Sequence, residues 1–194
     1  MTLAWLAAGE PFPPPGRIRL SFADAEAELV SDPYFASSTS RHRLWDGLGA
    51  YLARFVLLEQ RHQSLLSEPL VPFVWLGGSF VSNKQEPRNL DVTVALSGAG
   101  RLALKGQSGA GWLTDAFSRA RTTAEFDLCA LELPHLLVPS VFQSHRLRAD
   151  EQTYLRERGA WDDWWQRIRD AGEPNVGPSA HTAASRRGYV EVVL

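Results

Sequence analysis

The residues whose types and spacing could do chemistry lie between residues 73 and 96, in the run FVWLGGSFVSNKQEPRNLDVTVAL. A short apolar stretch leads into Gly77, Gly78 and Ser79, where small residues let backbone amides and a hydroxyl approach a phosphate closely. A second apolar stretch follows and contains Asp91. Because an unpaired carboxylate is costly to bury, Asp91 is a candidate functional residue. Together these features predict a phosphate seat next to a metal-binding carboxylate.

The polar residues of the second stretch alternate with apolar ones. In a strand, side chains two residues apart point to the same side, so Asn89, Asp91 and Thr93 are expected on one face of a sheet. Carboxylates in such positions hold divalent metal ions against phosphates during phosphoryl and nucleotidyl transfer. Here the alternation supplies one carboxylate, so a two-metal mechanism is disfavoured. The neutral carbonyl of Asn89 still offers a ligand to a single metal ion carried by a bound triphosphate.

These residues resemble the signature of the nucleotidyltransferase fold superfamily, in which a hydrophobic residue and Gly-Gly or Gly-Ser precede Asp-x-Asp or Asp-x-Glu. The run is also similar to a small uncharacterised bacterial family of nucleotidyltransferase-like proteins, with Gly-Ser-Phe-Val, a lysine, a proline and then Asp-Ile-Asp. The matching residues are Leu76, Gly77, Gly78, Ser79, Phe80, Val81, Lys84, Pro87, Asn89, Leu90 and Asp91. In this register Asn89 replaces the first acid, whereas a slip of two residues would make Asp91 the first and Thr93 the second.

The resemblance implies a transferase that binds a nucleoside triphosphate with magnesium or manganese. It implies catalytic roles for Asp91 and Asp127, and Asn89 as a further metal ligand beside these two. Asp127 is the candidate for the third acid, which usually sits on a following strand. The implied phosphate-binding residues are Gly77, Gly78, Ser79 and Lys84. The acceptor would be a protein, an RNA or a small molecule, and small domains of this kind often resemble components of toxin–antitoxin or phage-defence modules.

Two alternatives to catalysis remain open at this point. Because Asn89 stands in place of an acid, the protein could be a pseudoenzyme, a catalytically degenerate fold that binds a nucleotide or a partner protein. The motif could also be coincidental and belong to an unrelated α/β domain. The sequence therefore leaves the question of enzymatic activity open.

Composition limits the class of protein. The chain has 194 residues, of which 44% are hydrophobic, and this size suits a single globular domain with a sizeable core. A formal net charge of -2 gives no global attraction to nucleic acid or to an anionic membrane. The single cysteine, Cys129, excludes an intramolecular disulfide and predicts a reducing, cytoplasmic setting without a disulfide-linked partner. No run approaches the roughly 18 apolar residues of a membrane span, so no membrane partner is expected.

Helices and strands expected from the sequence must position the candidate site. Together they predict an α/β (α+β) fold, a mixed β-sheet with flanking helices. Helices are expected over residues 22–30 with Ser21 as the cap, 41–66 with Ser40 as the cap, 112–121, and 149–171, where the tryptophans form a buried stripe. Strands are expected over residues 73–76, 90–96, 125–133, where Asp127 interrupts the apolar run, and 189–194, at a sheet edge. The prolines at positions 11, 13, 14 and 15 predict an extended lead-in. Residues 97–111 are expected to form a glycine-rich loop and residues 172–188 a turn-rich segment. The chain divides into an N-terminal extension (1–39), a core motif region (40–134) and a helical region with a C-terminal strand (135–194).

Overall fold

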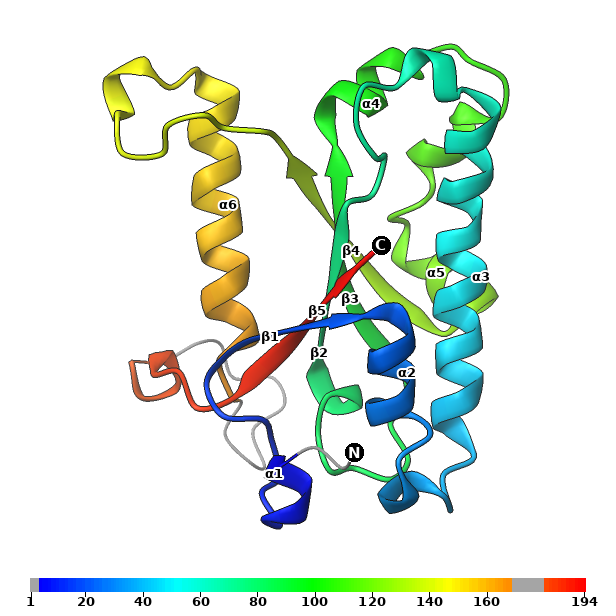
Figure 1. The fold of residues 1–194 in the computed structure, drawn as a ribbon, viewed down its shortest axis with the longest axis vertical. Coiled ribbons are helices and arrows are strands. Elements are labelled where there is room, and N and C mark those ends of the chain that lie inside the picture. Colours follow the sequence, from blue (N-terminus) through cyan, green and yellow to red (C-terminus); the bar gives the residue numbers. More distant parts are fainter. Residues whose placement is uncertain (1–3, 169–179) are drawn as a thin grey trace.

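The computed structural model of the protein describes residues 4–168 and 180–194. Its centre is a five-stranded mixed β-sheet with helices on both faces, which confirms the fold class that the sequence predicts (Figure 1). The strands are β1 (Gly16–Ser21), β2 (Phe73–Gly77), β3 (Leu90–Ser97), β4 (Leu128–His135) and β5 (Gly188–Val193). The α-helices are α1 (Ala4–Ala7), α2 (Phe22–Leu29), α3 (Ser40–Arg61), α4 (Gly98–Ala103), α5 (Arg119–Phe126) and α6 (Ala149–Trp165). Short 3-10 turns are η1 (Pro33–Phe35), η2 (Gln63–Leu65), η3 (Gly78–Phe80), η4 (Ala110–Thr114), η5 (Ser144–Arg146) and η6 (His181–Ala183).

The strand order of the sheet is β1-β5-β2-β3-β4. Strands β1 and β5 are parallel, as are β3 and β4, whereas β2 is antiparallel to both of its neighbours. The predicted edge position of the C-terminal strand is therefore wrong, because β5 lies between β1 and β2. Strand β1 itself was not predicted. Its side chains alternate between half-buried and exposed, and two of them are arginines, so its apolar signal is weak.

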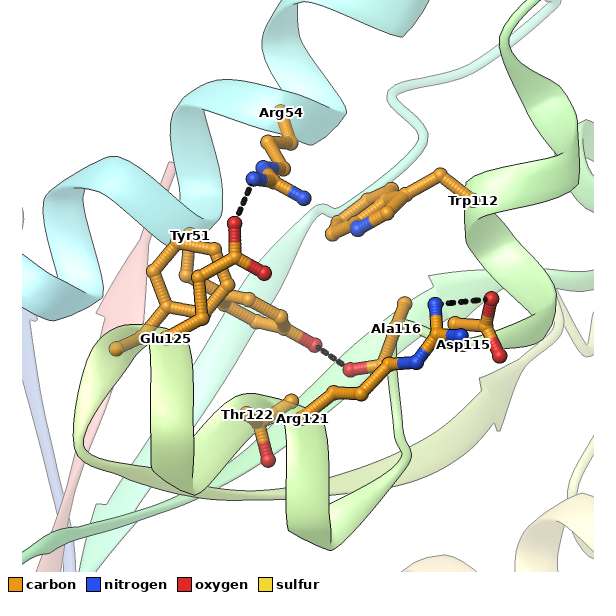
Figure 2. Close-up of a pocket in the computed structure, with 9 residues that line it drawn as sticks. Tyr51, Arg54, Trp112, Asp115, Ala116, Arg121, Thr122 and Glu125 are labelled. Atoms are coloured by element: carbon orange, nitrogen blue, oxygen red, sulfur yellow. Dashed lines mark hydrogen bonds and ion pairs between the residues drawn. The ribbon is translucent and has the colours of Figure 1, made fainter.

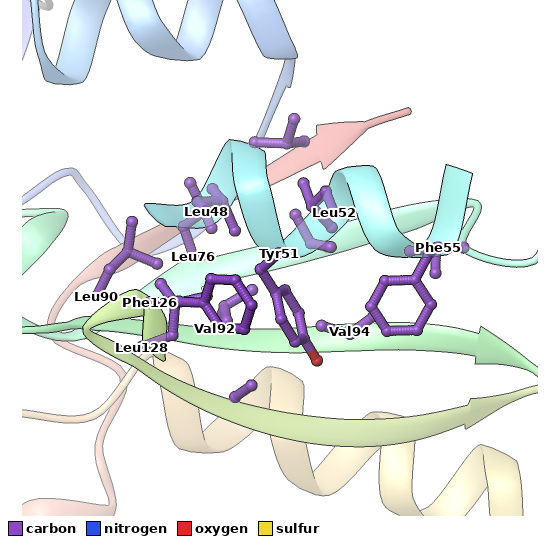
Figure 3. Close-up of a cluster of buried hydrophobic side chains, with 14 of the residues drawn as sticks. Leu48, Tyr51, Leu52, Phe55, Leu76, Leu90, Val92, Val94, Phe126 and Leu128 are labelled. Atoms are coloured by element: carbon purple, nitrogen blue, oxygen red, sulfur yellow. The ribbon is translucent and has the colours of Figure 1, made fainter. Parts of the chain in front are cut away.

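One face of the sheet carries the larger hydrophobic core, under α2, α3 and α5 (Figure 3). Helix α3 contributes an apolar stripe at steps of three and four residues, as the sequence predicts. The side chains from this stripe that Figure 3 labels are Leu48, Tyr51, Leu52 and Phe55, and those from the sheet are Leu76, Leu90, Val92, Val94 and Leu128. The helix ends at Arg61, earlier than predicted, and its N-cap position is Thr39 with Ser40 as the first helical residue.

The opposite face of the sheet is covered by α6, which stands apart from α3 across the sheet in Figure 1. Trp75, Tyr189 and Trp165 form a smaller cluster there with two further buried residues. Of the tryptophans predicted to face the core from this helix, Trp165 is buried, Trp161 is half-buried and Trp164 is exposed, so the predicted stripe is confirmed in part.

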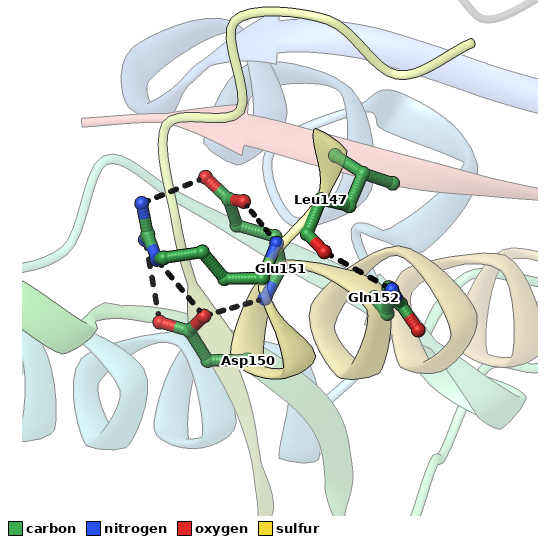
Figure 4. Close-up of polar contacts among 5 residues, drawn as sticks. Leu147, Asp150, Glu151 and Gln152 are labelled. Carbon is green, nitrogen blue, oxygen red and sulfur yellow. Dashed lines mark hydrogen bonds and ion pairs between the residues drawn. The ribbon is translucent and has the colours of Figure 1, made fainter. Parts of the chain in front are cut away.

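Helix α6 has a well-defined start (Figure 4). The Glu151 carboxylate accepts a hydrogen bond of 2.8 Å from the backbone N–H of Arg148, which satisfies a donor at the helix N-terminus. The Arg148 guanidinium pairs with the carboxylates of Asp150 and Glu151. The helix ends at Trp165, six residues before the predicted end. Of the predicted turn-rich segment, residues 172–179 lie outside the described residues.

Three further predicted elements differ from the structure. The predicted loop at residues 97–111 contains α4, whose first turn is capped by the Ser97 hydroxyl accepting from the N–H of Gly100. The helix predicted at residues 112–121 is wrong, because a 3-10 turn ends at Thr114 and α5 begins at Arg119. The strand predicted from residue 125 begins at Leu128 instead. The predicted helix α2 and its Ser21 cap are confirmed.

The described part of the chain contains no helix that is long and apolar enough to cross a membrane.

A buried cation, Arg41, holds the connection between β2 and β3 in place. Its side chain is fully buried, with the guanidinium 3.5 Å from the centre of the Phe35 ring. It donates four hydrogen bonds of 2.7 to 2.9 Å, all to backbone carbonyls, and the acceptors are those of Leu29, Phe80, Ser82 and Lys84. Burial lowers the pKa of Arg41 to about 10, so the side chain is still a cation at neutral pH. Arg41 thereby ties α2 and α3 to the turn that follows β2.

We expect replacement of Arg41 by methionine to lower the free energy of unfolding by about 3 to 5 kcal/mol, because buried carbonyls lose their donors. Arg41→Lys should recover only part of this loss, since an ammonium lacks the planar fork of donors. Urea unfolding followed by circular dichroism measures the change.

The matched control is Arg43→Gln on the same helix, where the exposed ion pair with Asp127 is worth at most about 1 kcal/mol. Equal effects of the two substitutions at positions 41 and 43 would contradict the role given to Arg41.

Candidate functional site

The predicted phosphate seat lies where β2 ends and η3 begins. Gly78 has a φ of +63°, a left-handed backbone conformation that favours glycine. A Cβ atom built on Gly78 would lie 3.0 Å from Cγ of Asp91 and closer still to its Oδ2. Gly77 pairs with Asp91 across the β2–β3 ladder. The structure therefore brings the glycine turn and Asp91 together, as the sequence predicts.

Asn89 and Asp91 point toward each other at the start of β3. The Asn89 amide donates a hydrogen bond of 2.9 Å from Nδ2 to Oδ1 of Asp91. Thr93, the next residue on this face, is buried and accepts a hydrogen bond of 3.0 Å from Nε1 of Trp165. The hydroxyl of Thr93 is thus engaged in the core. Of the two registers that the sequence leaves open, the polar pair beside the glycine turn is Asn89 and Asp91.

Asp127 does not join this pair. It lies after the last turn of α5 with a φ of 57°, and its carboxylate pairs with Arg43 of α3, on the opposite face of the sheet. The β4 residue in register with Asp91 is Cys129. Burial raises the pKa of the Cys129 thiol, and the charge of Asp91 raises it further. A thiol therefore stands on β4 where a third acid would have to face Asp91.

The residues present do not fit the magnesium site that the resemblance implies, with Asn89, Asp91 and Asp127 as ligands, because Asp127 lies on the other face of the sheet. Among residues 4–168 and 180–194, no group of three His, Cys, Asp or Glu side chains could hold a metal ion. Divalent magnesium prefers carboxylate oxygens and bound phosphates as ligands. Asp91 and the amide of Asn89 supply one carboxylate and one neutral oxygen.

A buried cation from the chain itself lies beside Asp91. Arg187 is 7% exposed and donates from Nη2 to the carbonyl of Gly78 at 2.8 Å and to that of Val81 at 2.7 Å. Burial lowers the pKa of Arg187 to about 10, and the nearby Asp91 carboxylate opposes this change. Arg187 precedes β5, so the pairing of the C-terminal strand positions it. Asp91 therefore has a positively charged neighbour without a metal ion.

The last turn of α6 covers the glycine turn on the side of the sheet where α6 lies. A Cβ atom built on Gly77 would lie 2.8 Å from Cδ2 of Trp165 and closer to other atoms of its indole ring. The ring thus packs directly against the backbone of Gly77. Ordinary side chains do not fit at this position, so the close approach of Trp165 explains the first glycine of the pair.

The other two predicted phosphate-binding residues lie in the turn that Arg41 and Arg187 hold. Ser79 is half-buried, and its carbonyl accepts a hydrogen bond from the Ser82 hydroxyl at 2.7 Å. Lys84 is exposed, and its carbonyl is an acceptor for Arg41. The structure brings Gly77, Gly78, Ser79, Asn89 and Asp91 together and leaves Lys84 at the outer side of the turn.

The sequence interpretation missed Arg41, Arg187 and Trp165 as neighbours of the site. Arg41 lies in phase with the apolar stripe of α3, which is the one local signal of a buried arginine. The pairing of β5 brings Arg187 to the turn, and the packing of α6 brings Trp165 there. Both are contacts between distant parts of the sequence, which local patterns do not predict.

A small hollow lies on the helix side of the sheet, between α3 and α5, away from the glycine turn (Figure 2). Ion pairs join Arg54 to Glu125 and Arg121 to Asp115 at its rim. Its volume of about 40 Å³ is far below the size of ordinary ligand pockets. This hollow is a packing feature of the α3–α5 contact.

Comparison with known proteins identifies the family of the chain. A family model described as "Family of unknown function (DUF6932)" matches residues 8–193, so the chain belongs to this family. No curated protein and no solved structure matches it. The family description states no activity, and the functional argument therefore starts from the geometry of the site.

We expect Gly78→Ala to lower the free energy of unfolding by about 2 kcal/mol or more, because alanine is strained at positive φ and its methyl group collides with Asp91. Chemical denaturation measures this loss. Gly49→Ala is the matched control, since Gly49 lies within α3 and a Cβ atom there meets nothing within 4 Å. It should gain up to about 1 kcal/mol from helix propensity.

The double variant Gly78→Ala/Asp91→Ala separates the two causes. When the Asp91 carboxylate is also removed, Gly78→Ala should cost about 0.5 kcal/mol or more less in the free energy of unfolding, which is the coupling energy of the pair. The remaining loss is due to backbone strain. Additive effects of the two substitutions would contradict the close contact between Gly78 and Asp91.

Proposed function

We propose that this member of the DUF6932 family is a non-catalytic binding module built on a nucleotidyltransferase-like fold. The single observation that carries the proposal is the buried guanidinium of Arg187 beside Asp91. In the enzymes that the sequence resembles, acids at this place hold magnesium against a triphosphate. Here a protein cation neutralises the remaining acid.

Electrostatics favours this interpretation over metal-dependent catalysis. A unit positive charge repels a divalent ion by about 8 kcal/mol at a separation of about 4 Å and an effective dielectric near 20, so the charge of Arg187 opposes the attraction that Asp91 alone would exert. Arg187 cannot move away easily, because Gly78 and Val81 accept its hydrogen bonds and the Phe12 ring lies 4.6 Å from its guanidinium carbon. Asn89 is neutral where the resemblance places the first acid, so it attracts a metal ion less than a carboxylate would. Arg187 adds a repulsive charge.

Packing supports the same conclusion. The Trp165 ring packs against Gly77, so α6 occupies this side of the glycine turn. A triphosphate in the usual position would have to displace this ring and its hydrogen bond to Thr93. The module would therefore hold its nucleotide or partner protein at a surface other than the glycine turn.

Nucleotidyl transfer is the competing function, and one observation favours it. The side chains of Asn89 and Asp91 converge at 2.9 Å beside Gly78, so a carboxylate and an amide lie together at the glycine turn, as ligands of a single metal ion carried by a triphosphate would. In that case a triphosphate with magnesium would bind at Asp91, and the acceptor would be a protein, an RNA or a small molecule.

Calorimetric titration of each nucleoside triphosphate with magnesium or manganese tests the proposal. For a non-catalytic module, the wild type and Asp91→Ala should give the same heats, because Asp91 holds no metal. Asn89→Asp should not create metal-dependent binding while Arg187 is present. Asp46→Asn, an exposed acid on α3, serves as the matched control.

Metal-dependent triphosphate binding that Asp91→Ala abolishes and Asp46→Asn preserves would overturn the proposal in favour of nucleotidyl transfer. Melting temperatures of all variants establish that each is folded before it is titrated.

A further inference from the structure

A groove of about 290 Å³ lies on the α6 face of the sheet, and no residue of the glycine turn lines it. Its lining comes from β1, β2 and α6, and consists of Arg17, Trp75, Leu155, Arg158, Gly159 and Asp162. The volume is just below the roughly 300 to 1,000 Å³ that ligand pockets span. A small molecule is therefore the occupant that the groove fits.

The acidic groups around the groove already have partners. The Glu191 carboxylate lies 3.2 Å from Nη1 of Arg17 and 3.4 Å from Nε of Arg19, and it accepts a hydrogen bond from Trp75. The Asp162 carboxylate accepts hydrogen bonds from the Tyr189 hydroxyl and from Gln166. Glu191 is thus paired with two arginines, whereas the partners of Asp162 are neutral donors.

Arg158 supplies a positive charge that these acids do not neutralise. Within the described residues, no carboxylate lies at ion-pair distance from its guanidinium. Burial lowers the pKa of His135, while the charge of Glu68 raises it and that of Arg158 lowers it. Guanidinium groups pair with phosphates and carboxylates through two parallel hydrogen bonds. Arg158 is therefore suited to hold an anion, and the exposed Arg17, which pairs with Glu191 through Nη1, lines the same groove.

Gly159 keeps this side of α6 open. A glycine within a helix costs about 1 kcal/mol relative to alanine. Its backbone is not left-handed, and a Cβ atom built on it meets nothing within 4 Å, so neither a turn nor packing requires glycine here. A larger side chain at this position would stand at the groove that Gly159 lines.

We propose that this groove binds a small organic anion. Arg158 and Arg17 would hold its phosphate or carboxylate group, and Leu155 would contact its apolar body. The inference goes beyond the proposed function, because it assigns a ligand class to a particular groove and depends on none of the residues around Asp91.

The test is an NMR titration of the full chain with phenyl phosphate and with benzoate, following the backbone amides around Gly159. The wild type should bind at least one of these probes, and the better one identifies the anionic group. Arg158→Gln and Gly159→Leu should each weaken binding about tenfold or more, through loss of a charged hydrogen bond and through filling of the groove. Gly159→Leu should also raise the melting temperature, so its loss of binding cannot come from unfolding.

Arg156→Gln, an exposed arginine of the same helix outside the groove, and Asp91→Ala should bind as the wild type does. Benzyl alcohol, an uncharged analogue, should not bind. The proposal is overturned if the wild type binds neither anion at millimolar concentration, if the two groove variants bind unchanged, or if benzyl alcohol binds equally well.

Discussion

The turn after β2 is held by buried arginines that bind backbone carbonyls instead of carboxylates, and the geometry of the candidate site depends on this constraint. Arg41 approaches from α3 and Arg187 from the residue before β5, and together they engage the carbonyls of Gly78, Phe80, Val81, Ser82 and Lys84. The Nη donors of these guanidinium groups and the buried carbonyls satisfy each other, so each group fixes the other. The helix layer, the turn and the C-terminal strand are thereby connected in one network.

This network also changes what the site can do. The turn keeps the close approach of Gly78 to Asp91, which is the part of a phosphate seat that glycine alone permits. The charge beside Asp91, however, comes from Arg187, and the adjacent sheet face is covered by Trp165. A metal ion would have to compete with a cation that is already in place. The same side chains that stabilise the turn therefore disfavour metal-dependent chemistry there.

Local patterns in the sequence predict part of this arrangement. The three- and four-residue spacing of apolar residues predicts α3, and the glycine turn with the alternation around Asp91 predicts β2, β3 and their contact. The position of β5 could not be predicted, because it depends on pairing with β1, more than half the chain away in sequence. Asp127 was misplaced for a related reason. A short apolar run indicates a strand, but Asp127 ends α5 before that strand begins, so its carboxylate turns to the helix face.

The central claim is that Arg187 takes the place of a metal ion beside Asp91. Electron paramagnetic resonance of manganese added to the full wild-type chain, without nucleotide, tests it most directly, because free and bound manganese give different signals. The account predicts that manganese stays free at millimolar concentration, as it does with Asp91→Ala. Manganese bound by the wild type and released by Asp91→Ala would contradict it.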